Sequence, residues 1–328
     1  MARVTTTTPP SSVFLPPSPS SFFSFYRTHS ALTSLLQSAL NQQASKHSFI
    51  ASLIAAAEKR SEDGGASLAR LTAITAPMAA MWKSTAPIHD NSHLTLPDPY
   101  YRLAARMNLG LQPFHNKLPS VCPSCIKHKA LAKDSWHFLS CNHWKRRQVT
   151  VRHDAVVNAL WSYVNTIGGM AMREPGGLVL GEKRRPDLLL TFPGQQILTD
   201  VVVSHPLCPT HHLRACTKHA AVAEFASAKK QEKYEATAAT QHARLPPFSV
   251  ETTGGMARGA IELLEQVSLA CRDTLSVWPH WQIVKEMKQA VAVAIQKGNA
   301  MTMLAGYSAA VTLARSVRAV DRMEDNCK

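Results

Sequence analysis

The sequence lacks several patterns that would assign it to a familiar class. No apolar run approaches the about 18 consecutive residues that a membrane span needs. Internal repeats are absent, and so are the glycine-rich P-loop of nucleoside triphosphatases and the Tyr/Phe-x-Asp-Asp pair of polymerases. We therefore expect neither a membrane-spanning protein, a repeat protein, a P-loop enzyme nor a self-contained polymerase.

Acidic residues are missing from the N-terminal region, where none occurs before Glu58 although Arg3, Arg27 and Lys46 do. Residues 1–30 are rich in Ser, Thr and Pro, and we expect them to be disordered. An acid-free, Ser/Thr-rich start is typical of an organellar transit peptide, but the high proline content favours a low-complexity tail.

The chain has only 7 cysteines in 328 residues, but three of them and a histidine have the spacing of a metal-binding site. Cys122 and Cys125 form a CxxC pair, and after eleven intervening residues His137 and Cys141 form an HxxxC pair. The first pair places two thiolates on one turn, and the second places an imidazole and a thiolate on one helical face. Together they predict a closed Cys₃His tetrahedron, which is a structural zinc site rather than a catalytic one, in a reducing compartment.

The ligand set of this zinc knuckle has alternatives. His143 could replace Cys141 as the fourth ligand, and His128 is a weaker candidate. A loop with unliganded thiols is the third possibility.

Positive charge dominates around the knuckle and in the whole chain. The net charge is +14 at pH 7, which favours a polyanionic partner. Residues 121–155 have a surplus of five positive charges, from seven cations and two acids. These are Lys127, Lys129, Lys133, Lys145, Arg146, Arg147 and Arg152 against Asp134 and Asp154. Trp136 and Trp144 lie between them, which suits a nucleic-acid surface, with a solvated basic loop as the alternative.

Two aspartates, Asp187 and Asp200, lie thirteen residues apart in the most strand-like stretch of the chain, residues 187–203. If a hairpin is centred between Pro193 and Gly194, Asp187 and Asp200 face each other with Cβ atoms roughly 5 Å apart. Like charges so placed repel, and a divalent cation between them is the usual compensation. Proline cannot take the positive φ of common two-residue turns, so a four-residue loop with the same centre, or a bulge that shifts the register, stays open.

The elements around this hairpin predict an α/β fold with the order αβββαβ. Its expected parts are a helix at 149–164, a strand at 170–173, the two hairpin strands, a helix at 217–244 and a strand at 247–252. Helical patterns also cover 31–83, 98–109, 260–275 and 282–320, the last split by Gly298. We divide the chain into a disordered tail (1–30), a helical segment (31–115), the zinc knuckle (116–148), the α/β core (149–255) and C-terminal helices (256–328).

In this order the motifs resemble the C-terminal part of site-specific non-LTR retrotransposon proteins. In that family a Cys-Cys-His-Cys knuckle precedes a restriction-like endonuclease of the PD-(D/E)xK type. The matching residues are the zinc knuckle, Arg152-His153-Asp154, Arg185-Pro186-Asp187, Asp200 and Lys230-Gln-Glu-Lys233-Tyr234, with softer matches at 104–106, 109–111, 250–252 and 254–255. The resemblance covers about residues 80–310.

The chain departs from the family pattern in two ways. The reverse transcriptase that normally precedes this module is missing, which is what a truncated or domesticated fragment would show. Val202 stands two residues after the second acid, where a simple D-x-K signature has lysine. The family's lysine can come from the following helix instead, which makes Lys230 the candidate, with Lys233 and Lys229 as neighbours.

The resemblance implies Mg²⁺ or Mn²⁺ held by Asp187 and Asp200, with the carbonyl of Val201 and a third carboxylate from Glu174 or Asp154. The lysine would orient or deprotonate water or stabilise the pentavalent phosphate, and two nearby acids favour this last, electrostatic role by raising its pKa. Expected phosphate contacts are Arg152, His153, Lys183, Arg184 and Arg185, together with Lys145, Arg146 and Arg147.

The function implied is a metal-dependent DNA endonuclease that nicks DNA for target-primed integration, or a domesticated equivalent. Its partner would be DNA, with RNA as the alternative and a polymerase acting in trans. The expected location is the nucleus, with an organelle as the alternative. Two other readings stay open: a zinc-stabilised nucleic-acid-binding protein with a decayed nuclease site, and a non-functional retroelement remnant.

Overall fold

The computed structural model describes residues 64–84, 94–114, 120–125, 129–131, 134–141, 145–176, 185–240, 243–272 and 279–326. The chain divides into Met1–Leu53 and Ile54–Lys328, and every described residue lies in the second unit. The predicted disordered tail and most of the first predicted helices lie outside the described residues. So do His128, His143, Trp144, Lys183 and Arg184.

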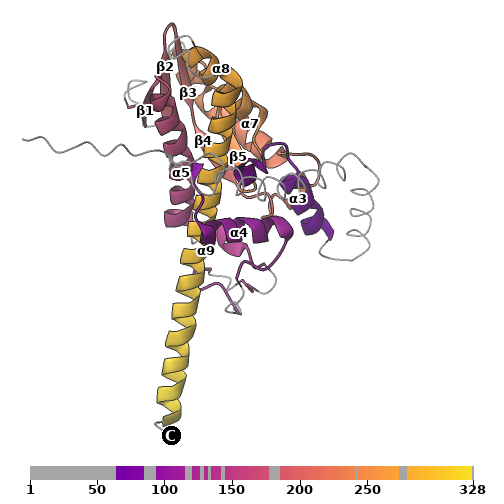
Figure 1. Cartoon of the computed structure of the whole chain (residues 1–328). Helices are drawn as coiled ribbons and strands as arrows, with labels where there is room; N and C mark the ends of the chain where they lie inside the picture. Colours follow the sequence, from indigo (N-terminus) through magenta and orange to yellow (C-terminus); the bar gives the residue numbers. More distant parts are fainter. Residues whose placement is uncertain are drawn as a thin grey trace, which may run out of the picture. The chain divides into compact units, whose positions relative to one another are not determined.

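The described residues form a mixture of helices and strands (Figure 1). In chain order the elements are α3 (Gly64–Ile74), η2 (Met81–Ser84), α4 (Asp98–Leu109), η4 (His137–Leu139), α5 (Lys145–Thr166), β1 (Met170–Arg173), β2 (Leu188–Phe192), β3 (Gln195–Thr199), β4 (Val201–Ser204), α6 (His212–Ala215), α7 (Ala221–Thr240), β5 (Phe248–Glu251), α8 (Arg258–Arg272) and α9 (His280–Asn326). Of the helices described, none is both long enough and apolar enough to cross a bilayer. The order α5, β1 to β4, α7, β5 matches the predicted αβββαβ sequence of elements, with the third strand in two pieces.

The hairpin register predicted from the sequence is confirmed. Leu188 pairs with Thr199 and Phe192 pairs with Gln195, so the loop contains only Pro193 and Gly194. Gly194 has a φ of 71°, so the glycine supplies the positive φ that proline cannot adopt. Neither a four-residue loop nor a bulge is present, and β1 extends this antiparallel sheet in the order β1-β2-β3.

The strand after the turn is interrupted at Asp200, where the sequence predicts one continuous strand. β3 ends at Thr199, and β4 begins at Val201 and pairs in parallel with β5. The Asp200 carbonyl accepts the N–H of Phe248 at 3.0 Å, and Ile197 bridges Arg244 in parallel, so both pieces face the same later segment. The chain thus changes partners at Asp200 without changing direction.

The helix predicted at 217–244 is shorter in the structure, where α7 covers Ala221–Thr240 and residues 217–220 form a turn. α6 ends at Ala215, and α7 begins only after Ala220, whose φ of 55° is incompatible with a continuous right-handed helix. α7 joins β4 to β5, as the parallel pairing of these strands requires.

The C-terminal helices complete the core instead of forming a separate layer. Val156 and Leu160 of α5, Leu190 of β2, Leu263 of α8 and Val291 of α9 are buried in one cluster. α9 is continuous through Gly298, contrary to the expectation that this glycine splits the helix. The reason for the glycine is close approach, because a Cβ there would lie 2.6 Å from the Cα of Arg152 in α5.

Candidate metal centres

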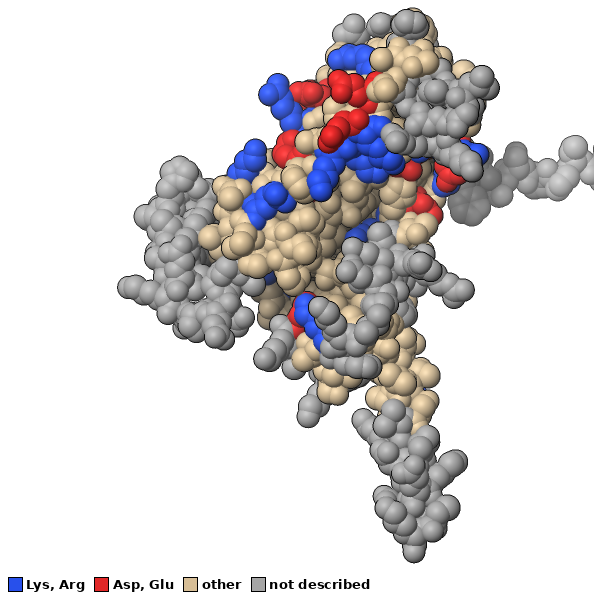
Figure 2. Space-filling view, turned by 180° about the vertical axis from the view of Figure 1, so that it is seen from behind, with Lys and Arg blue, Asp and Glu red and all other residues tan. Residues whose placement is uncertain are grey.

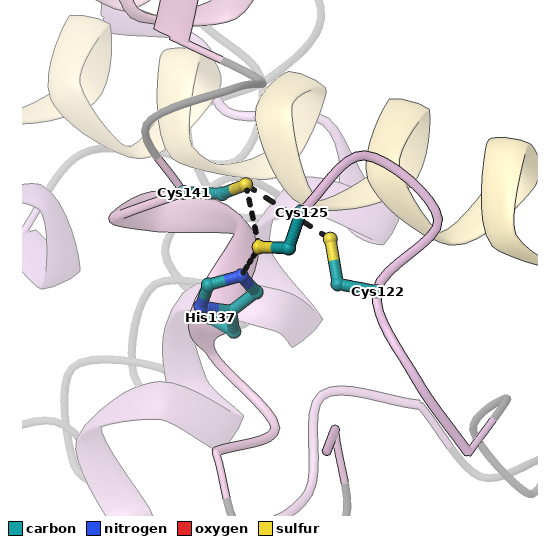
Figure 3. Close-up of side chains that lie close together, drawn as sticks. All are labelled: Cys122, Cys125, His137 and Cys141. Carbon is teal, nitrogen blue, oxygen red and sulfur yellow. Dashed lines mark hydrogen bonds between the residues drawn. The ribbon is translucent and has the colours of Figure 1, made fainter. Parts of the chain in front are cut away.

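The predicted zinc ligands come together in the structure, and Figure 3 shows their side chains pointing toward one another. Cys125 Sγ lies 2.8 Å from His137 Nε2 and 3.4 Å from Cys141 Sγ, and Cys122 Sγ lies 3.9 Å from Cys141 Sγ. Tetrahedral zinc with Zn–S bonds of about 2.3 Å separates its sulfur ligands by about 3.8 Å. These four residues could therefore bind a zinc ion.

Local backbone pairing and a small hydrophobic core hold the four ligands. Cys122 donates its N–H to the Lys129 carbonyl at 2.9 Å, beside the bridge between Val121 and Ala130. His137 begins the 3-10 helix η4, which ends before Cys141, so the expected α-helical spacing of this pair is replaced by a tighter turn. The cluster around the ligands includes Cys122, Cys141, Phe138, Met107 of α4 and Met303 of α9.

The charges of this group also fit a bound cation. Burial and the neighbouring Cys141 and Cys122 raise the pKa of the Cys125 thiol to about 12, so three thiolates do not coexist here without a positive ion. Outside the ligands, Asp134 Oδ2 lies 3.7 Å from His137 Nδ1 and accepts a hydrogen bond from Lys129 Nζ at 2.7 Å. A carboxylate beside the second ring nitrogen of a metal-binding histidine is a common way to orient the ring.

The second candidate centre is built on Asp187 and Asp200, at the point where the sheet changes pairing. Asp187 directly precedes β2, and its carbonyl accepts the N–H of Glu174 at 2.9 Å. Its side chain reaches across the hairpin, because Asp187 Oδ2 accepts the N–H of Val201 at 2.6 Å. The Asp200 side chain is 4% exposed and that of Asp187 is 19% exposed, so the pair lies at the edge of the interior.

Of the three lysines considered from the sequence, Lys230 is the one that forms an ion pair with Asp200. Lys229 Nζ instead lies 4.5 Å from the Phe225 ring centroid, and Lys233 Nζ donates to the Tyr234 hydroxyl at 2.7 Å. The difference follows from helix geometry, since neighbouring residues on α7 point about 100° apart. Lys230 shares the inward face with Tyr234, which is 3% exposed.

His153 contacts Asp187 rather than solvent. Its Nε2 lies 3.0 Å from Asp187 Oδ2 and its Nδ1 lies 3.1 Å from Asp154 Oδ1. Burial by itself would lower the pKa of His153, but the two carboxylates outweigh it and raise this pKa to about 9. The expected phosphate contact of His153 is thus replaced by a charged bridge between α5 and the start of β2.

Burial and the charge of Asp187 raise the pKa of Asp200, while the neighbouring Lys230 and Tyr234 side chains oppose that rise. The two carboxylates therefore repel each other despite the nearby lysine. Asp187 Oδ1 makes no hydrogen bond with the residues that the structure describes. A hard cation would find a free oxygen there and would relieve the repulsion.

Neither proposed third carboxylate joins the two aspartates. Glu174 is exposed with a φ of 45°, and its contact with Asp187 is a backbone hydrogen bond. Asp154 is linked to Asp187 only through His153. Within the described ranges, the zinc ligands are the only group of three or more metal-binding side chains.

Arg152 departs most from its expected role as a phosphate contact. It is 2% exposed at the crossing of α5 and α9, and its Nη1 approaches Asn299 Oδ1 at 3.4 Å. Desolvation lowers the pKa of its guanidinium to about 10. Arg185 is exposed, as expected for a phosphate contact. Lys145, Arg146 and Arg147 form the first turn of α5, but their side chains lie outside what the structure describes.

Two buried residues were not assigned a role from the sequence. The Tyr234 hydroxyl donates to the Arg185 carbonyl at 3.1 Å and so joins α7 to the segment before Asp187. Glu251 Oε1 accepts the N–H groups of Val222 and Ala223 at 3.1 and 3.4 Å, which fixes the start of α7. An acid at the end of an apolar strand was the available signal for Glu251. Both residues hold the helix that carries Lys230.

Comparisons of the sequence with protein-family models and with curated proteins found no match. The two candidate centres therefore rest on the chemistry and geometry of the described residues.

Proposed function

We propose that this chain is a metal-dependent DNA endonuclease of the restriction-like kind, derived from a non-LTR retrotransposon and stabilised by a zinc knuckle. The observation that carries the proposal is the meeting of Asp187, Asp200 and Lys230, which come from the start of β2, the junction of β3 and β4, and α7. Phosphodiester hydrolysis requires acids that hold a metal ion and a cation that stabilises the phosphate. The two aspartates near the strand break and the lysine on α7 supply these groups. The net charge of +14 supports a nucleic-acid substrate.

Asp187 and Asp200 would hold Mg²⁺ or Mn²⁺, which supplies charge neutralisation at the phosphate and an acidified water when bound. Lys230 Nζ forms an ion pair with Asp200, which places its ammonium group beside the proposed metal ligands. That ammonium would stabilise the negative charge that develops on the phosphate. His153 and the Val201 N–H fix the orientation of the Asp187 carboxylate.

The Cys₃His group has a structural role in this proposal. Four protein ligands would fill a tetrahedral zinc ion's coordination positions and leave none for substrate. A bound ion would tie η4 and the CxxC turn to α4 and α9 through Met107 and Met303. Zinc would thus stabilise the fold without taking part in cleavage.

The decisive experiment measures nicking of supercoiled plasmid with and without Mg²⁺ or Mn²⁺. Wild-type protein should nick only with the metal, and Asp187→Asn and Asp200→Asn should abolish nicking while binding DNA normally. Gln282→Glu, which adds a charge on α9 outside both centres, is the control and should nick like wild type. Equal nicking by wild type and both aspartate variants would rule out this site.

A second candidate function is a zinc-stabilised nucleic-acid-binding protein whose nuclease site has decayed. One observation favours it: in the described part, no third carboxylate, histidine or cysteine forms a metal-binding group with both Asp187 and Asp200. It predicts salt-dependent DNA binding by the wild-type protein without metal-dependent nicking. The plasmid assay therefore separates the two functions.

A further inference from the structure

The corner between α6 and α7 carries a cationic surface that neither candidate centre uses. The 23 residues between Asp200 and Glu224 contain no acid, but they include Arg214 and Lys218 and four histidines. The Arg214 guanidinium lies 3.6 Å from the Phe225 ring centroid, and Lys229 Nζ lies 4.5 Å from the same centroid. Two cations from different helices therefore converge on one aromatic ring.

We propose that Arg214, Phe225 and Lys229 form a binding surface for the sugar-phosphate backbone of a nucleic-acid strand leading to Asp187 and Asp200. This inference rests on the proposed function and specifies which surface holds the substrate. The distances to the shared ring place the two cationic groups at most about 8 Å apart. Like charges that close repel each other, and phosphates are the anions that would balance them.

Internal pairing does not account for these cations. Across the described residues, no carboxylate forms an ion pair with Arg214 or Lys229. Glu224 Oε1 instead accepts the N–H of Arg258 at 2.7 Å, at the start of α8. Glu232, one turn along α7, is exposed and makes no ion pair with Lys229. The positive charge at the α6–α7 corner thus remains available to an external anion.

Packing on Phe225 also prepares the two side chains for binding. Long cationic side chains lose rotamer freedom when they bind, and contact with a ring removes part of that freedom beforehand. Lys229 directly precedes Lys230, so this surface and the Asp200 ion pair lie on adjacent faces of one helix turn. Figure 2 shows lysine and arginine side chains gathered, with acids among them, on the upper half of the rear face. A strand held at the corner would therefore pass close to the proposed metal site.

The test is the salt dependence of binding to a short DNA duplex and to a single strand of the same sequence. Each phosphate contact contributes a slope of about 0.9 for a duplex and about 0.7 for a single strand in log affinity against log salt concentration. The double variant Arg214→Gln/Lys229→Gln removes two proposed phosphate contacts. Its slope should therefore be lower than the wild-type slope by nearly two contributions, measured on whichever of the two DNAs the protein binds. Lys285→Gln, an exposed lysine of α9, is the matched control and should keep the wild-type slope.

The outcomes separate this surface from the nuclease proposal. Metal-dependent nicking with an unchanged slope in the double variant overturns the surface and leaves the nuclease standing. A reduced slope without nicking by wild type supports the surface and rejects the nuclease. If the protein binds vesicles of anionic phospholipid and does not bind DNA, the proposed nucleic-acid surface is wrong. The proposal is also wrong if Lys285→Gln loses as much slope as the double variant.

Discussion

Lys230 of α7 forms an ion pair with Asp200, the residue at which β3 gives way to β4. The Lys230 ion pair therefore lies where the chain leaves the antiparallel β1-β2-β3 sheet and begins to pair with β5. Lysines 229 and 233 lie on the same helix but contact aromatic side chains instead. This relationship assigns the lysine of the proposed site and gives the first prediction.

Lys230→Met should lower the rate of metal-dependent nicking by about 100-fold, because it removes the positive charge next to the reacting phosphate. Lys229→Met alters the neighbouring residue and should change the nicking rate far less at low salt. Initial rates on supercoiled plasmid at saturating Mg²⁺ measure both. A larger loss in Lys229→Met than in Lys230→Met would contradict the assignment.

His153→Ala should lower nicking by about 10- to 100-fold, since it removes the group that orients a proposed metal ligand, Asp187. His153→Gln keeps a donor near the position of Nε2 and should recover part of the activity. DNA affinity and its salt dependence should remain at wild-type values in both variants. A reduced salt dependence of DNA binding in these variants would contradict this role and support the phosphate contact that the sequence predicts for His153.

Glu251 should make folding stability depend on pH. Burial raises the pKa of its carboxyl from 4.5 to about 7, against hydrogen bonds from Val222, Ala223 and Thr253. Because the folded protein holds this proton more tightly than the unfolded chain, the contribution is complete below pH 4.5 and is lost as pH rises through about 7. The loss amounts to about 3 kcal/mol.

Glu251→Gln keeps an oxygen acceptor for the start of α7 but cannot ionise, so this part of the pH dependence should disappear. Denaturant unfolding of wild type and variant between pH 5 and pH 8, compared as a difference, cancels effects such as zinc release that both proteins share. A constant difference in unfolding free energy across this range would contradict the prediction.

Zinc removal should loosen the contact between the knuckle and two helices. Cys141→Ser should lower the zinc content from one ion per chain and lower the melting temperature. Amide exchange should increase near Met107 of α4 and Met303 of α9, whose side chains pack against the ligands. Exchange near Val291 should change less, because that residue packs in the α/β core. Cys208→Ser, a cysteine outside the cluster, should leave zinc content unchanged.

Gly298→Ala should destabilise the protein by about 1–3 kcal/mol, because its Cβ would collide with Arg152. Helix propensity alone predicts the opposite sign, a gain of about 1 kcal/mol. Ser308→Ala, at an exposed position of α9, is the control and should have little effect. Chemical denaturation distinguishes these outcomes.

Much of the fold could be predicted from local patterns. The register of β2 with β3, the bounds of α4 and β1, and the grouping of the four candidate zinc ligands all follow from short-range spacing. The continuity of α9 through Gly298 could not be predicted, because it depends on the close approach of α5 at Arg152. Nor could the start of α7 after Ala220, where the chain takes a positive φ.

The site shows the same division between local pattern and long-range packing. Asp187, Asp200 and the lysines of α7 were identifiable because acids in apolar strands and a lysine-rich helix are local signals. The burial of Arg152 could not be read from its neighbours, since it results from α9 crossing α5 almost 150 positions later in the chain. Nor could the sequence reveal that His153 faces Asp187.

The sequence by itself determined which residue types are available for two candidate metal centres and the register of β2 with β3, because these depend on spacing within a few dozen residues. Only the tertiary structure decided that Lys230 and not Lys229 meets Asp200, and that Arg152 is interior. The physical reason is that the direction of a side chain on a helix matters only once the helix is packed, and the partners of α5 and α7 lie far away in the chain.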